Sequence, residues 1–123
     1  MDDTVLLERN GALARITLNR PQVHNAFDDA MVAGLQAALD AIAQDEGVRC
    51  VLLTGAGKSF SAGADLNWMR GMARAGAEEN RADALRLAAL MHTLNFFPKP
   101  TLARVNGAAY GGSVGLVACC DIA

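Results

Sequence analysis

Residues 50–66 read CVLLTGAGKSFSAGADL, and residues 101–122 read TLARVNGAAYGGSVGLVACCDI. Each stretch starts with a short apolar run that predicts a buried strand, and each passes through small residues into a helical pattern. Small residues let a ligand approach the main chain, and free N–H groups at a helix start attract negative charge. Either loop alone is an ordinary tight turn, but two facing loops after neighbouring strands can hold one oxygen atom.

The rest of the chain predicts an α/β architecture. The Asn10-Gly11 pair between two alternating segments is typical of a β-hairpin. Asp28 is a good N-cap for a helix that reaches about Gln44. We expect a mobile loop over residues 73–78. The predicted strands cover residues 4–8, 12–19, 49–54 and 101–105, and the predicted helices cover residues 28–44, 66–72, 79–96 and 113–120.

Composition argues against several classes of function. The chain has 123 residues, 52% of them hydrophobic, and a net charge of −2 without a basic run, so nucleic-acid binding is not expected. No apolar run approaches the ~18 residues of a membrane span. The acidic start, Met1-Asp2, lacks the apolar region of a secretory signal. Cys50, Cys119 and Cys120 lack metal-ligand spacing. We expect a soluble, cytoplasmic protein with reduced thiols and no metal.

Two familiar catalytic motifs nearly fit this sequence. Gly57-Lys58-Ser59 resembles the end of a phosphate-binding P-loop, but that motif needs glycine where Leu52 stands. Residues 111–115 match the G-x-S-x-G motif of serine hydrolases, which requires a strand that ends at the serine and a histidine partner. The predicted strand ends earlier, and no histidine follows Ser113. A serine hydrolase is therefore the weakest alternative.

Three motifs in order carry a family resemblance: ITLNRPQVHNAF at residues 16–27 and the two stretches at 50–66 and 101–122. With them the chain resembles the crotonase (enoyl-CoA hydratase/isomerase) superfamily along its whole length. The resemblance implies a crotonase-like spiral of ββα units, with residues 1–123 as the N-terminal part of a single acyl-CoA-binding domain that lacks its C-terminal helical region. It also implies homotrimers or dimers of trimers, and no cofactor beyond the coenzyme A of the substrate.

The same resemblance implies which residues form the site. The backbone N–H groups of Ala64 and Gly112 match the two donors of an oxyanion hole. The positions that match substrate-binding residues are His24, Ala26, Lys58, Ala62, Gly63, Asp65, Leu66, Trp68 and Gly111. Lys58 matches a basic position near the CoA phosphates. Alternatives stay open for three of them: a surface histidine for His24, a helix cap for Asp65, and core packing for Trp68.

The sequence departs from the hydratase pattern at the acid/base positions. Hydratases of this superfamily carry a glutamate three residues after the second donor, where this chain has Gly115, and another about twenty residues further on, beyond Ala123. Hydration needs such proton-transfer groups, so we expect the 123-residue chain alone to be inactive. The sequence of residues 61–69 and 115–123 resembles that of methylglutaconyl-CoA and carboxygeranoyl-CoA hydratases, which act in leucine and acyclic terpene breakdown. Enoyl-CoA hydratase is the expected function; a double-bond isomerase and a non-catalytic CoA-binding fragment remain alternatives.

Overall fold

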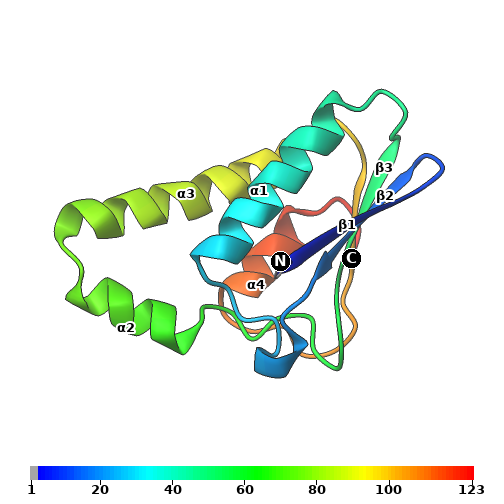
Figure 1. Cartoon of the computed structure of the whole chain (residues 1–123). Coiled ribbons are helices and arrows are strands. Elements are labelled where there is room, and N and C mark those ends of the chain that lie inside the picture. Colours follow the sequence, from blue (N-terminus) through cyan, green and yellow to red (C-terminus); the bar gives the residue numbers. More distant parts are fainter. Residues whose placement is uncertain (1–2) are drawn as a thin grey trace.

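A four-stranded sheet forms one layer of the molecule, and its helices lie against one face of that sheet (Figure 1). The computed structural model describes residues 3–123, so the expectation drawn from Met1-Asp2 concerns residues outside the described part. The strands follow each other across the sheet in chain order. They are β1 (Val5–Asn10), β2 (Leu13–Leu18), β3 (Cys50–Gly55) and β4 (Thr101–Arg104).

The connections between strands decide where the loops lie. β1 and β2 form the expected antiparallel hairpin, whereas β2, β3 and β4 are parallel. The crossover from β2 to β3 is α1 (Asp29–Gln44), and the crossover from β3 to β4 contains α2 (Leu66–Arg74) and α3 (Ala77–Asn95). Because β3 and β4 run in the same direction, the loops that leave their carboxyl ends meet at one edge of the sheet. The predicted α/β class is confirmed.

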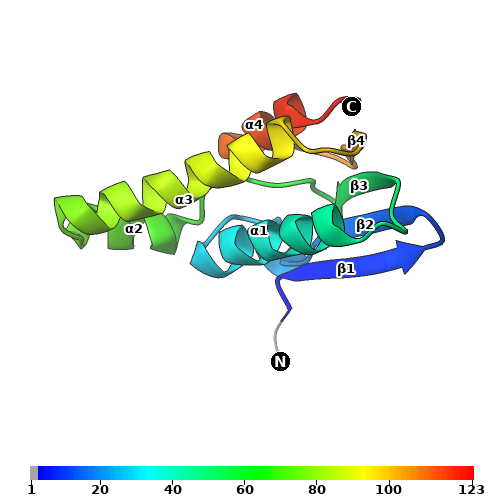
Figure 2. The ribbon, with the colours of Figure 1, turned by 90° about the horizontal axis from the view of Figure 1, so that it is seen from above.

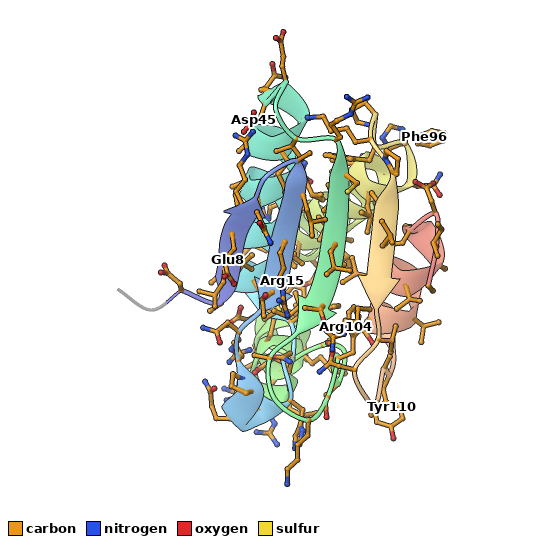
Figure 3. All side chains as sticks on the ribbon, turned by 90° about the vertical axis from the view of Figure 1, so that its right-hand side faces the viewer. Glu8, Arg15, Asp45, Phe96, Arg104 and Tyr110 are labelled. Carbon is orange, nitrogen blue, oxygen red and sulfur yellow. The ribbon has the colours of Figure 1, made fainter. Side chains whose placement is uncertain are left out.

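The hydrophobic core lies between the sheet and the helices. β2 contributes Ala14, Ile16 and Leu18, each at most 1% exposed. α1 turns an apolar face to this core, and its buried residues are Met31, Val32, Leu35, Ala38, Leu39 and Ile42. Leu90 and Leu94 of α3 join the same cluster. The opposite face of the sheet carries the charged Glu8, Arg15 and Arg104 (Figure 3), which is typical of a sheet packed on one side.

The expected loop at residues 73–78 is wrong. α2 continues to Arg74 and α3 begins at Ala77, so only Ala75 and Gly76 separate the two helices. The alanines on both sides are strong helix formers, and Gly76 is the one residue there that favours a break. Glu79 and its neighbour Glu78 lie in the first turn of α3, where the helix dipole favours negative charge. α2 and the first half of α3 form an arm that projects away from the sheet (Figure 2).

None of the helices within residues 3–123 is long and apolar enough to cross a membrane. The same residues hold no group of three or more His, Cys, Asp or Glu side chains placed to bind a metal ion. The three cysteines are free thiols. Burial raises the pKa of the Cys120 thiol to about 11, so this thiol is protonated at neutral pH and is a weak nucleophile.

The N-cap of α1 provides a test of this fold. The Asp28 carboxylate accepts a hydrogen bond of 2.9 Å from the Met31 N–H. We expect Asp28→Ala to lower the free energy of unfolding by about 1 kcal/mol, because that N–H loses its acceptor. Asp28→Asn keeps a side-chain oxygen in place and is expected to lose less, as measured by urea unfolding followed by circular dichroism. The Asp28 carboxylate also lies 3.5 Å from an Arg20 nitrogen. Equal losses in both variants would assign the effect to this ion pair and contradict the capping role.

Candidate active site

The first loop of the site, residues 61–65, pairs with the segment at residues 24–27. The Phe27 N–H donates to the Gly63 carbonyl at 2.7 Å, and the Asp65 N–H donates to the Phe27 carbonyl at 2.7 Å. The Ala62 N–H adds a bond of 2.8 Å to the His24 carbonyl. These bonds make Phe27 and Ala64 partners in a short parallel bridge. The first loop is therefore held like an extra strand, although it has no regular strand sequence.

This pairing fixes the direction of the Ala64 amide. In a trans peptide the carbonyl and the following N–H point in opposite directions. The Gly63 carbonyl points at Phe27, so the Ala64 N–H points away from that segment. Within residues 3–123 this N–H donates no hydrogen bond, and Ala64 is half-buried. The chain thus holds a rigid donor without a partner.

The second loop, between β4 and α4 (Gly112–Cys119), places another such donor beside the first. Gly111 has φ 56° and ψ −131°, a conformation open to glycine but strained for other residues. It directs the chain into α4, whose first N–H groups have no partner inside the helix. The Gly112 N–H is one of them, and it donates to no acceptor in the described part of the chain. The positive end of the helix dipole adds to its attraction for an anion.

The two loops touch main chain to main chain. A Cβ atom added to Gly63 would lie 2.9 Å from the Tyr110 carbonyl oxygen and 3.5 Å from the Gly112 nitrogen. A Cβ atom added to Gly111 would lie 3.7 Å from the Gly63 Cα. Ala64 and Gly112 directly follow these contacting glycines in the sequence. Their free N–H groups therefore lie on either side of one close contact.

A cleft of about 500 Å³ opens beside the first loop. Its lining consists of Val23, Ala26, Ala62, Ala64, Asp65, Leu66, Asn67 and Arg70. The sequence pointed to Ala26, Ala62, Asp65 and Leu66 but missed the rest of the lining around Ala64. Two of the missed residues, Asn67 and Arg70, lie three positions apart on α2, a spacing that puts their side chains on one face of the helix. Which face of α2 turns to the cleft depends on tertiary packing.

The remaining predicted residues lie around this cleft rather than in its lining. The His24 Nδ1 atom is 3.0 Å from the Ser59 hydroxyl, so His24 and Lys58 belong to neighbouring, exposed segments. Trp68 packs against the hydrophobic core and lies outside the lining of the cleft. Tyr110, which precedes Gly111, is exposed at the end of the sheet that carries the loops (Figure 3).

Comparisons with known proteins agree with this arrangement. The family model for enoyl-CoA hydratase/isomerase matches residues 8–123. The chain belongs to the enoyl-CoA hydratase/isomerase family. A putative enoyl-CoA hydratase from Thermus thermophilus is 46% identical over 112 residues, which are 91% of this chain and 44% of that protein. The crystal structure of an enoyl-CoA hydratase from Shewanella pealeana has a TM-score of 0.95 at 46% identity and covers 97% of this chain and 45% of that one.

A relative with another activity belongs to the same comparison. 4-Chlorobenzoyl coenzyme A dehalogenase-1 from Arthrobacter is 37% identical over 123 residues, which are 99% of this chain and 45% of that protein. Its name and the names of the hydratases all refer to a coenzyme A thioester, but they refer to different reactions. This family member thus spans less than half the length of the relatives that it matches.

Asp65 of this family member is a helix cap. Its Oδ1 atom accepts a hydrogen bond of 3.0 Å from the Trp68 N–H at the start of α2. This is the helix cap that the sequence offered as an alternative to a substrate-binding role. Its Oδ2 atom lies 3.3 Å from an Arg20 nitrogen, which also donates to the Ala26 carbonyl at 2.6 Å. The Trp68 N–H, with a smaller contribution from Arg20, lowers the pKa of the Asp65 carboxyl against the opposing effect of burial. The group is ionised and engaged.

Neither Asp121 nor the position of the first expected glutamate offers a free carboxylate. The Asp121 carboxylate accepts from the Thr101 N–H at 2.9 Å, which is a structural contact at the start of β4. The position of the first expected glutamate is Gly115, where an added Cβ atom would lie 3.1 Å from the end of the Met91 side chain. Ser113 is fully buried and its hydroxyl donates to the Tyr110 carbonyl at 2.7 Å. The serine-hydrolase alternative is therefore wrong, because the nucleophile is inaccessible.

The contact at Gly63 can be tested directly. Gly63→Ala places a methyl group 2.9 Å from a backbone oxygen at φ 90°, so we expect the free energy of unfolding to fall by about 2 kcal/mol or more. Gly71→Ala is the matched control, because Gly71 lies inside α2 with nothing within 4 Å of an added Cβ atom. It should be neutral or slightly stabilising. Urea unfolding of both variants makes the comparison, and a harmless Gly63→Ala would contradict the close approach.

Proposed function

We propose that this chain binds the thioester group of an acyl-CoA and stabilises its enolate with the N–H groups of Ala64 and Gly112. The observation that carries the proposal is the pair of fixed, unpartnered donors on either side of the Gly63 contact. Removing or adding a group at the β-carbon of a thioester gathers negative charge on the thioester oxygen. Two preorganised donors in a site without water stabilise that charge, each by about 3–4 kcal/mol.

For the whole protein, the proposed reaction is hydration of an enoyl-CoA. Water adds at the β-carbon, the electron pair moves to the thioester oxygen, and a proton returns to the α-carbon. In this reaction the described residues supply the stabilisation of negative charge on the thioester oxygen. They supply no free carboxylate beside the two donors, since Asp65 caps α2 and Asp121 is bonded to Thr101 at the start of β4. General acid/base groups would therefore have to come from outside residues 3–123.

The proposed substrate enters along the cleft beside Ala64. The lining is mostly apolar, with the Arg70 guanidinium on its α2 side. Lys58 and His24 are exposed on neighbouring segments, and a compact ammonium group suits a phosphate of coenzyme A. The likeness of residues 61–69 to methylglutaconyl-CoA hydratases supports a branched enoyl-CoA as the substrate. A homotrimer or dimer of trimers is proposed from the resemblance to the crotonase superfamily.

A double-bond isomerase is the second candidate. The observation that favours it is Gly115, because one of the two carboxylates that hydration uses in this superfamily is missing from its place. An isomerase moves one proton between two carbons and incorporates no water.

The assay that tests the proposal uses the intact protein with a branched trans-2-enoyl-CoA in water enriched in ¹⁸O. We expect loss of the conjugated thioester absorbance, with one ¹⁸O atom in the 3-hydroxy product. A shifted double bond without the label would instead establish the isomerase. Tight binding of the thioester without any reaction would leave only a binding function and overturn the hydratase proposal.

The donor at Gly112 can be removed without a change of side-chain chemistry. Proline is well suited to the first position of a helix, so Gly112→Pro deletes the N–H while α4 can still form. Gly112→Ala keeps the N–H, and its Cβ atom would meet Phe27 at an ordinary 3.7 Å. We expect kcat to fall by about 100- to 1000-fold in the proline variant and to change little in the alanine variant. Similar kcat values for both, with wild-type thermal stability, would contradict a role for this N–H.

A further inference from the structure

Ser61 is the point at which three segments of the site meet. It is fully buried and is the first residue of the first loop. On one side its backbone faces the second loop, because Ser61 and Ala109 form a parallel bridge. The Tyr110 N–H donates to the Ser61 carbonyl at 3.0 Å, and the Ser113 hydroxyl reaches the same carbonyl at 3.2 Å. The main chain of Ser61 therefore holds the residues that lead into Gly112.

The side chain of Ser61 faces the other way. Its hydroxyl donates to the Asn25 carbonyl at 2.8 Å and accepts from the Gly63 N–H at 3.1 Å. Asn25 is also fully buried and has a positive φ of 55°, which is uncommon for a residue with a side chain. The hydroxyl thus satisfies a buried carbonyl in a strained turn and a buried N–H in the first loop.

These two bonds bear on the direction of the Ala64 amide. The peptide group before Gly63 is held by the Ser61 hydroxyl, and the peptide group after it is held by Phe27. Together they fix both planes around a glycine, which has little conformational preference of its own. Without the hydroxyl, Gly63 would keep one of the two anchors, and the next N–H could rotate.

We propose that Ser61 is a positioning residue that sets the relative placement of the Ala64 and Gly112 N–H groups. Its main chain anchors the second loop and its hydroxyl anchors the first. The inference rests on the proposed function of these two amides. It assigns Ser61 no contact with the substrate, so its effect should be on the reacting oxygen and not on the binding of coenzyme A.

The test compares Ser61→Ala with the wild type in the intact protein. One readout is the infrared carbonyl stretch of bound butyryl-CoA labelled with ¹³C at the thioester carbon, because this saturated thioester reports polarisation without reacting. The other is the split between kcat and KM. We expect a smaller carbonyl shift than in the wild type and a kcat lower by about 10- to 100-fold, less than for complete loss of a donor. KM should stay within about threefold of the wild-type value, since the contacts that bind substrate and transition state equally are unchanged.

A matched control removes another buried hydroxyl. Thr101 is 2% exposed, and its hydroxyl bonds with Asp121 at the end of β4 far from the loops. Thr101→Val should lower stability but leave the carbonyl shift and kcat unchanged. Ser61→Cys keeps the shape of the side chain with a weaker hydrogen-bonding group, so it should give intermediate values. If Ser61→Ala fails to fold, Ser61→Cys still tests the positioning role of Ser61.

The outcomes separate the two proposals. If butyryl-CoA binds to the wild type without a carbonyl shift, the proposed function of the two amides fails, and the inference about Ser61 fails with it. If the wild type shows the shift and folded Ser61→Ala or Ser61→Cys shows the same shift and kcat, the amides keep their function and Ser61 has no positioning role. If Thr101→Val alters the carbonyl shift and kcat as much as Ser61→Ala does, the positioning role of Ser61 is equally overturned, because general destabilisation would then explain both results.

Discussion

The approach of two loops, main chain against main chain, is the constraint on which the site depends. Where the first loop passes the second, a single added methyl group at Gly63 would meet the Tyr110 carbonyl at 2.9 Å. This contact is possible only because β3 and β4 are parallel neighbours, so that both loops leave the same edge of the sheet. It brings together two N–H groups, at Ala64 and Gly112, that are 48 residues apart in a chain of 123.

The free donors are backbone groups, and so the groups that hold them matter more than their own side chains. Phe27 pairs with the first loop on both sides of Ala64, and α4 begins at the second donor. Ser61, the first residue of the first loop, joins it to the second loop with all of its polar groups engaged. A site built in this way is rigid before any ligand arrives, which is the condition for electrostatic stabilisation of a developing charge.

Relatives whose names give different reactions share this part of the chain. A hydratase and a 4-chlorobenzoyl-CoA dehalogenase are both similar to it, and their names have the coenzyme A thioester in common. The proposed role of the two amides concerns only the thioester that these names share. In this chain Gly115 stands where a hydratase glutamate is expected. Asp65 caps α2, and Asp121 is bonded to Thr101 at the start of β4.

The sequence by itself determined the elements, the buried faces and the two loops, because period, capping residues and small residues act locally. Asp28 and Asp65 could be predicted as caps from their position before an apolar pattern. The helix break at Gly76 was misplaced because strong helix formers on both sides override a flexible composition. Only the tertiary structure decided that the loops touch, that Arg70 faces the cleft and that Trp68 packs against the core. Those facts depend on strand order and helix rotation, which arise from packing between residues far apart in the chain.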